Sequence, residues 1–435
     1  MTESERGVVL RGGAVLTLDP AGTVHTPGAV AVVGGRIASV GTPATAPPWP
    51  TVDMPDCLLL PGLVNTHTHS PMWLYRGLTE DVPRGEWLTG RMRPLERRVG
   101  PEELRAGALA GCLELLGNGV TTIADRYAHM EAVAAAVEAS GLRAIVAHSL
   151  YDTSAEDGLA TTERLLARFG SDPAHSRITA GLGPHACDSC GPDLLRRVRR
   201  LADDSGGRVF IHLAQSAEEV AVVRARGFAG PAAYLDALGL LAPDVVAAHG
   251  TYLTDQEAEL VGRRGTAIAH CPSSNAKLEA RVAPIGRLRT SGAVVGLGTD
   301  AASCNNGMDM LEEMKVAGLL NKVASGDPAA FSGTELLRMA TIDGARALGL
   351  DHLVGSLETG KRADVIAVRA ASPRVAPWHD PVANLVYAAR GSDVAAVWVD
   401  GEQLVRDGQP TRLDSGAIVA AGRAAAEALH TFSRR

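Results

Sequence analysis

The chain has no excess of basic charge and few cysteines. Its 435 residues carry 42 lysines and arginines against 49 aspartates and glutamates, a formal net charge of −7. Without a basic surface, nucleic acid is not an expected partner. Only six cysteines are spread over this long chain, which favours reduced thiols over a disulfide framework. Both features are typical of a cytoplasmic protein.

Long apolar runs are also missing. No stretch reaches the roughly 18 consecutive apolar residues that a membrane helix needs, and the acidic, polar start at 1–6 does not resemble a signal peptide. We therefore expect no membrane partner. The chain does contain 46% hydrophobic and 21% charged residues, which is typical of a folded globular protein. Because its length is about twice what one compact core usually holds, a large domain and a smaller one are expected.

Short β-branched apolar runs recur through the middle of the chain and alternate with segments of helical spacing. Each run ends in a polar or glycine-containing tip. Eight strand–helix alternations predict an α/β fold, a (β/α)8 TIM barrel. A doubly wound open sheet is the alternative, but it does not explain why so many tips carry histidine or aspartate. The eight runs begin near residues 58, 121, 144, 178, 208, 245, 267 and 294.

Both ends of the chain are rich in β-strand signals. Strand-like runs broken by glycine pairs occupy the first 57 residues, and similar runs recur at 364–368 and 395–399. We predict a small β-sandwich domain formed by residues 1–57 and 360–435, which closes with a helix near 415–430. This domain would flank a metal-dependent barrel domain of residues 58–359.

Two histidines, His67 and His69, end the first barrel run. On a strand, residues i and i+2 point to the same side, so both imidazoles can share one metal ion. His212, His249 and Asp300 stand at three other strand tips, and all strand tips of a barrel meet at one mouth. Imidazole and carboxylate suit zinc or a similar first-row ion. The pattern predicts an open catalytic site for one divalent metal ion, Zn²⁺ first, with Fe²⁺ or Mn²⁺ as alternatives.

Longer motifs around these residues resemble a known family. The segment 61–69, Pro-Gly-Leu-Val-Asn-Thr-His-Thr-His, resembles the opening of the amidohydrolase superfamily. The similarity is closest to its S-adenosylhomocysteine and methylthioadenosine deaminases and to the triazine chlorohydrolases, and it covers nearly the whole chain. Further matching motifs lie at 76–77, 183–185, 211–213, 248–250, 270–275, 298–300 and 355–364.

The resemblance implies a mechanism based on metal-activated water. His67, His69, His212 and Asp300 would hold the ion. Asp300 would also take a proton from the attacking water, and His249 would form hydrogen bonds to that water and to the developing oxyanion. The physical reading agrees, because a carboxylate that touches the ion is a sensible acceptor for the proton of the water.

Five residues are candidate substrate contacts. The resemblance assigns His185 to a purine ring and Glu96 to ribose hydroxyls. His148 stands where members that take S-adenosylhomocysteine have an arginine for the amino-acid carboxylate, so a bidentate clamp is missing or moved. A neutral substrate without a free carboxylate therefore fits better. Trp87 and Asn305 complete the set of candidate substrate contacts.

The clearest departure from the family pattern follows the fifth strand. The deaminases have His-x-x-Glu there, and the glutamate protonates the ring nitrogen as water attacks, whereas this chain reads His-Leu-Ala-Gln at 212–215. The amide of Gln215 donates a hydrogen bond but is not an acid, and the loss of a positioned acid typically costs ~10²–10⁴ in rate. Glu218 and Glu219 follow one turn later and are expected to face solvent.

Three interpretations follow from the motifs. The first is an aminohydrolase that removes an amino group from a purine-like or other N-heterocyclic small molecule, such as a nucleoside, with Gln215 in the catalytic set. The second keeps metal-dependent hydrolysis but displaces chloride or opens a cyclic amide, and Gln215 favours it. The third is a weakly active or non-catalytic homologue that binds a heterocycle. The resemblance also implies a homo-oligomer, in the simplest case a homodimer.

Overall fold

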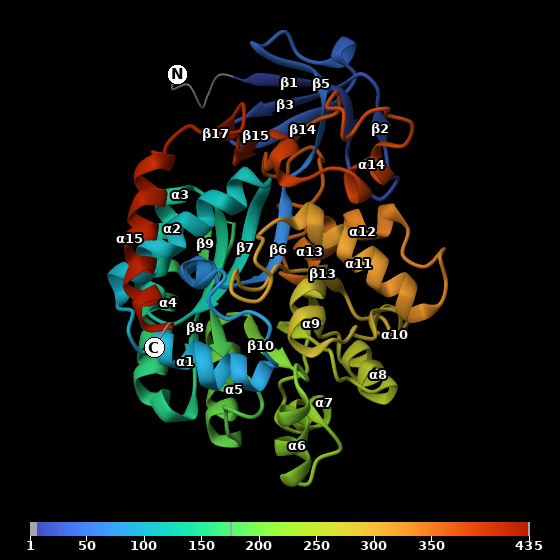
Figure 1. Cartoon of the computed structure of the whole chain (residues 1–435). Helices are drawn as coiled ribbons and strands as arrows, with labels where there is room; N and C mark the ends of the chain where they lie inside the picture. The colour runs from blue at the N-terminus through green and yellow to red at the C-terminus, as the bar shows by residue number, and fades with distance from the viewer. Residues whose placement is uncertain (1–6, 175, 434–435) are drawn as a thin grey trace.

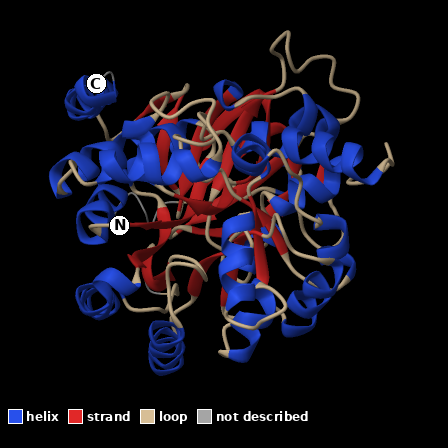
Figure 2. Ribbon diagram, turned by 60° about the horizontal axis from the view of Figure 1, so that its bottom comes forward, coloured by secondary structure: helices blue, strands red, loops and turns tan. Residues whose placement is uncertain are grey.

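The computed structural model describes residues 7–174 and 176–433; the start at 1–6, judged above not to be a signal peptide, lies outside them. Within the described residues, eight parallel strands curve into a barrel that is surrounded by helices, and a mixed sheet lies across one end (Figures 1 and 2). Neighbouring barrel strands follow one another in the chain. The predicted (β/α)8 fold is therefore confirmed, and the doubly wound sheet is excluded. The barrel strands are β6 (Leu63–Thr68), β7 (Val120–Tyr127), β8 (Arg143–Leu150), β9 (Ile178–Pro184), β10 (Val209–Leu213), β11 (Val245–His249), β12 (Ala267–His270) and β13 (Val295–Leu297).

Helices cover the outer face of the barrel. Outward side chains of the strands, such as Ile123 and Val146, pack in one apolar cluster with helical residues, while inward ones, such as Ala124 and Ile145, fill the barrel. Burial on both faces explains why the strands read as nearly continuous apolar runs. The helices of this layer are α2 (Pro101–Gly117), α3 (Met130–Ser140), α4 (Ala155–Phe169), α5 (Pro192–Ser205), α6 (Ala217–Ala225), α7 (Pro231–Ala237), α8 (Asp255–Arg264), α9 (Pro272–Glu279), α10 (Ile285–Thr290), α11 (Met310–Ser325), α12 (Gly333–Met339) and α13 (Ile342–Ala347).

Both chain ends meet in the mixed sheet, as predicted. Its strands are β1 (Val8–Leu16), β2 (Val24–His25), β3 (Gly28–Val33), β4 (Arg36–Gly41), β5 (Thr51–Pro61), β14 (Val365–Arg369), β15 (Val394–Val399), β16 (Glu402–Arg406) and β17 (Gln409–Pro410). β5 pairs with β1 in parallel and with β14 in antiparallel orientation. The apolar triplet at 58–60, expected from the sequence to begin the barrel, therefore belongs to this sheet. The proposed limits of the two domains stay a prediction.

The two sheets are joined directly. A single residue, Gly62, separates β5 from β6, and a Cβ there would lie 2.1 Å from the Thr121 hydroxyl oxygen. Only glycine fits this passage without a shift of β7. At the other end of the chain, α14 (Pro381–Tyr387) follows β14, and α15 (Ser415–Ser433) confirms the predicted C-terminal helix. α15 returns along the barrel beside α2, where Gly422 lies against Ala110 (Figure 1).

Three short helices lie between β6 and α2: a 3-10 helix at Ser70–Tyr75, a π-helix at Glu86–Met92 and α1 (Arg93–Glu96). Single 3-10 turns lie at Pro43–Thr45, Asp152–Ser154 and Gly391–Asp393. Across residues 7–174 and 176–433, none of the helices combines the length and the apolar character that a bilayer crossing requires.

A seam between β6 and β13 closes the barrel. The backbone N–H of Asp300 donates to the His67 carbonyl at 3.0 Å, and the Thr68 hydroxyl donates to the Asp300 carbonyl at 3.1 Å. Gly298 permits this approach, because a Cβ there would lie 2.9 Å from the His67 carbonyl oxygen. Asp300 itself has a φ of 56°, a left-handed conformation that is uncommon outside glycine. The turn sets its carboxylate beside the histidines of β6.

A buried arginine ties the small sheet to the barrel. Arg143, at the start of β8, donates to both carboxylate oxygens of Asp364 at 3.1 and 3.0 Å and to Asp400 at 2.6 Å. The side chains of Arg143 and Asp364 are 3% and 1% exposed. Although burial opposes it, the two carboxylates raise the pKa of Arg143. The contact links the first residue of a barrel strand to the residues that precede β14 and follow β15 in the mixed sheet.

We expect Arg143→Met to destabilise the whole protein. The substitution leaves the Asp364 carboxylate buried without its cation, and removing one partner of a buried pair typically costs ~3–5 kcal/mol. Urea unfolding followed by circular dichroism measures the change in the free energy of unfolding.

Arg164→Met is the matched control. Arg164 pairs with Glu131 on the surface, where the two side chains are 56% and 49% exposed, and such exposed pairs contribute little to stability. Equal effects of the two substitutions would contradict a structural role for the buried pair.

Candidate metal centre

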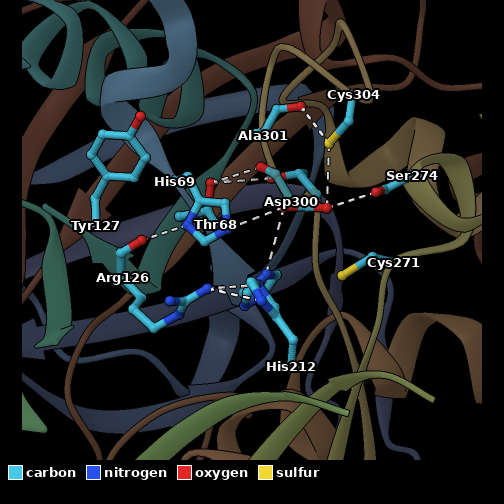
Figure 3. A network of polar contacts seen from close by, with 12 residues as sticks. Thr68, His69, Arg126, Tyr127, His212, Cys271, Ser274, Asp300, Ala301 and Cys304 are labelled. Atoms are coloured by element: carbon cyan, nitrogen blue, oxygen red, sulfur yellow. Dashed lines mark hydrogen bonds and ion pairs between the residues drawn. The ribbon is translucent and has the colours of Figure 1, made fainter. Parts of the chain in front are cut away.

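Four strand ends bring histidines and one aspartate together in the barrel mouth (Figure 3). His67 and His69 come from β6, His212 from β10 and His249 from β11, and Asp300 follows β13. The Nε2 atoms of His67 and His69 lie 3.5 and 3.3 Å from Oδ1 of Asp300. Nε2 of His249 lies 3.9 Å from the other carboxylate oxygen.

Two overlapping sets of ligand atoms could hold a metal ion. In the described residues they are His67 with His212 and His249, and His67 with His69 and Asp300, and the atoms of each set lie within 4.8 Å of one another. All five side chains are buried. The structure therefore brings together the residues that the sequence predicted as ligands, with His249 beside them.

The hydrogen bonding and the protonation of the imidazole nitrogens are suited to binding a metal ion. Nε2 of His67 and Nε2 of His249 are buried and have no hydrogen-bond partner among the described residues. An unpaired buried polar atom is costly, and a bound cation would satisfy it. Burial lowers the pKa of His69 and His212 well below the ordinary value and that of His249 to about 4. Neutral imidazole is the form that binds metals.

Neighbouring groups orient two of the imidazoles. Nδ1 of His69 donates to the Arg126 backbone carbonyl at 2.5 Å, and Nδ1 of His249 donates to the side-chain oxygen of Asn275 at 2.9 Å. When Nδ1 carries the proton, Nε2 keeps its lone pair free for a ligand. Asn275 lies in the sequence motif at 270–275, but the sequence alone gave it no role.

Two further donors hold the carboxylate of Asp300. The Ser274 hydroxyl donates to Oδ2 at 2.6 Å, and the Cys304 thiol lies 3.3 Å from the same oxygen (Figure 3). Although burial acts in the opposite direction, His67 and the neighbouring histidines hold the pKa of Asp300 well below its usual range. The carboxylate is therefore ionised at neutral pH, as a metal ligand or a proton acceptor must be.

A buried arginine that the sequence analysis missed shares the mouth. Arg126 on β7 is 3% exposed, and it donates to the Ser149 hydroxyl at 3.0 Å. Its other terminal nitrogen lies 2.6 Å from Nε2 and 3.1 Å from Nδ1 of His212 (Figure 3). Metal binding through Nε2 of His212 requires the guanidinium to leave that nitrogen. The available signal was an arginine directly after an aspartate near the tip of a fully buried strand.

His185 and Glu96 lie beside the cluster. The ring of His185, just after β9, is 4.9 Å from the ring of His212 between centroids. Glu96 accepts a hydrogen bond from the Tyr127 hydroxyl at 2.7 Å, and the Tyr127 ring is 6.0 Å from that of His69. Both positions are compatible with the predicted substrate contacts.

His148 lies outside the mouth, which corrects its prediction as a substrate contact. It precedes Ser149, whose hydroxyl meets Arg126 in the barrel interior. Successive residues of a strand point to opposite faces, so His148 faces the helices, where Gly158 of α4 packs against its ring. A polar residue near a strand tip is ambiguous in this respect until the register is known.

Trp87 and Asn305 both attach to the loop after β13. The Trp87 indole N–H donates to the Ser303 carbonyl at 3.3 Å. The amide nitrogen of Asn305 donates to the Thr299 carbonyl at 2.8 Å and to Glu313 at 2.9 Å. These bonds hold the loop that follows the metal-site strand, and a contact of either side chain with substrate stays a prediction.

Gln215 follows β10 and is 7% exposed. Its side-chain oxygen accepts a hydrogen bond from the Arg84 guanidinium at 3.0 Å. The backbone N–H groups of Ala214 and Gln215 donate to the Glu219 carboxylate at 3.1 and 2.8 Å. Glu219 is 1% exposed, so the expectation that it faces solvent was wrong, whereas Glu218 is exposed. Burial raises the pKa of Glu219 to about 7.

A parallel barrel whose mouth gathers imidazoles around one carboxylate defines the class of metal-dependent barrel hydrolases. The family model of the Amidohydrolase family matches residues 58–404. The chain belongs to this family, and the resemblance seen in its motifs is confirmed.

Individual relatives share both sequence and fold with the chain. A 5-methylthioadenosine/S-adenosylhomocysteine deaminase of Pelotomaculum thermopropionicum is 41% identical over 418 residues, which cover 95% of this chain and 96% of the relative. The crystal structure of an adenosine deaminase from Xanthomonas campestris with bound zinc has a TM-score of 0.94 at 34% identity and covers 98% of both chains. Atrazine chlorohydrolase from Arthrobacter aurescens TC1, also complexed with zinc, has a TM-score of 0.89 at 25% identity and covers 96% of this chain and 100% of that one.

We expect the purified protein to contain about one divalent ion per chain and His69→Asn to lose it. The substitution removes a nitrogen that lies 3.3 Å from Asp300. Metal analysis by mass spectrometry after desalting measures the content, and circular dichroism checks the fold.

The matched control is His148→Asn, a histidine that faces the helices. This variant is expected to keep the ion. Retention of metal by His69→Asn, or loss from both variants, would contradict the assignment of the centre.

Proposed function

We propose that this protein is a metal-dependent deaminase of adenosine-like nucleosides. The observation that carries the proposal is the cluster of four imidazoles in the barrel mouth, three of which, from His67, His69 and His249, lie 3.3–3.9 Å from the Asp300 carboxylate. The similarity to adenosine-type deaminases over nearly the full chain supports the same conclusion. The ion is proposed to be Zn²⁺, because nitrogen ligands with one carboxylate suit it and the two solved relatives contain zinc.

The proposed ligands are His67, His69, His212 and Asp300. When bound, a divalent cation lowers the pKa of a coordinated water toward neutrality and so supplies hydroxide. Asp300 is ionised and can accept the proton of the attacking water. His249 donates from Nδ1 to Asn275, so its unpartnered Nε2 is free to orient that water.

The proposed substrate has an uncharged 5′ substituent. Arg126 lies against His212, at the level of the ligand cluster, so it does not replace an arginine that would hold a distant carboxylate. His185 is proposed to contact the heterocycle, and Glu96 is proposed to accept hydrogen bonds from the ribose hydroxyls. Methylthioadenosine and 5′-deoxyadenosine meet this description.

A second candidate function is displacement of a leaving group other than ammonia. Gln215 favours it, because an amide cannot protonate a ring nitrogen during attack. Chloride on a heteroaromatic ring or the C–N bond of a cyclic amide would be the reacting group. The similarity in fold to atrazine chlorohydrolase is consistent with this chemistry.

We expect ammonia release from methylthioadenosine and 5′-deoxyadenosine to exceed release from S-adenosylhomocysteine. Dialysis against a chelator should abolish the activity, and Zn²⁺ should restore it, because the attacking water depends on the cation. A coupled glutamate dehydrogenase assay measures the ammonia.

Asp300→Asn serves as the inactive reference in the same assay. Chloride released from a chlorinated heterocycle without ammonia from any nucleoside would favour the second candidate. Nucleoside binding in calorimetry without any product would contradict both.

A further inference from the structure

The side chain of Gln215 is held in one orientation by its neighbour. Arg84 donates to the Gln215 side-chain oxygen at 3.0 Å. A guanidinium has only donors, so the amide oxygen and not the amide nitrogen must face it. Among the described residues, the amide nitrogen of Gln215 has no hydrogen-bond partner. That nitrogen is the group left for a ligand.

Arg84 in turn lies beside a mostly buried carboxylate. It is 7% exposed, and its Nε lies 3.9 Å from Oε1 of Glu279, a side chain that is 9% exposed. The other oxygen of Glu279 accepts a hydrogen bond from the Tyr252 hydroxyl at 2.7 Å. If Arg84 moved away, the mostly buried Glu279 carboxylate would lose the cation that pairs with it in the structure, which is costly.

The backbone of Gln215 is fixed as well. Ala214 has a φ of 48°, and the Glu219 carboxylate accepts the N–H groups of both Ala214 and Gln215. With the backbone held from one side and the amide oxygen from the other, little freedom remains for the side chain. A group held in this way is preorganised to bind.

We propose that Arg84 is a positioning residue that turns the Gln215 amide so that its N–H faces the substrate. The Gln215 amide then donates a hydrogen bond to the substrate but does not act as a general acid. The matching substrate carries an unprotonated acceptor, a ring nitrogen or a ring carbonyl oxygen, next to the carbon under attack. The inference rests on the proposed function, because its kinetic test measures deamination. It adds to that function the substrate atom that is recognised, the acceptor next to the attacked carbon.

The same contact explains what a glutamate would do at this position. A carboxylate beside Arg84 would form an ion pair, and a nearby opposite charge favours the ionised form. Such a glutamate would remain deprotonated at neutral pH and could not act as an acid. Gln215→Glu alone therefore restores no general acid, whereas removal of Arg84 as well should restore one.

The test compares kinetics of the zinc-loaded wild type, Gln215→Glu, Arg84→Met and the double variant with methylthioadenosine. Gln215→Glu should change kcat by less than about 10-fold, and the double variant should exceed it by ~10² or more. Arg84→Met should raise KM by about 10-fold with a smaller change in kcat, and Arg84→Lys should recover part of this loss. A large gain in kcat from Gln215→Glu alone, or wild-type kinetics of Arg84→Met, would overturn the proposal.

Arg91→Met is the matched control for Arg84→Met. Arg91 lies in the same segment of the chain, but its side chain is 44% exposed and pairs with Glu86, and it has no contact with Gln215 in the described structure. Its removal should leave KM and kcat unchanged. An equal rise in KM would mean that the effect comes from lost positive charge and would overturn the positioning role.

A binding experiment keeps this inference separate from the proposed function. In the inactive Asp300→Asn background, where adenosine is not consumed during calorimetry, we expect the protein to bind adenosine about 10-fold more tightly than 1-deazaadenosine, which lacks the ring nitrogen next to the amino-bearing carbon. Adding Gln215→Leu to this background should make the two affinities equal. Equal binding by Asp300→Asn would overturn the inference even if the wild type releases ammonia, and discrimination by Asp300→Asn with no ammonia release by the wild type would leave the inference standing while the proposed function fails.

Discussion

The hydrogen bond from the Asp300 amide to the His67 carbonyl is the contact on which the site depends. It joins the first and last strands of the barrel, and His67 is also the member shared by both candidate sets of metal ligands. Closure of the barrel and assembly of the site are therefore one event. The left-handed backbone at Asp300 and His249 lies beside this seam, and such strained residues persist only where the surrounding structure determines them.

The charges nearest the imidazole cluster and Gln215 come from one carboxylate and two arginines. Asp300 is the ionised carboxylate that faces the imidazoles, while Arg126 lies against His212 and Arg84 against Gln215. Both cations are more than nine-tenths buried. Glu279 balances the charge of Arg84, so the positive charge in excess would lie at Arg126 and the metal ion, where it would stabilise negative charge that develops on an attacked ring.

Periodicity predicted the fold well, because both the alternation of strands and helices and the tips of the strands are local features of the sequence. The residues that meet in the mouth could also be predicted, since the i, i+2 spacing and the strand tips determine where they lie. The predictions that failed concern residues whose position depends on how the strands pair. A buried apolar triplet such as 58–60 has the same sequence pattern whether it belongs to the barrel or to the mixed sheet. The face on which His148 lies depends on strand register. The roles of Arg126 and Ser274 come from partners on other elements, which no local pattern contains.

The direct passage from β5 through Gly62 into β6 has a consequence for how substrate enters. The crowding of Gly62 against Thr121 and the ion pairs of Arg143 leave no hinge between the mixed sheet and the barrel. Substrate therefore does not enter by a rocking motion of the mixed sheet against the barrel. Ligand exchange must depend on movements within the segments that border the mouth, above all the stretch of 81–97 that contributes Arg84, Trp87 and Glu96.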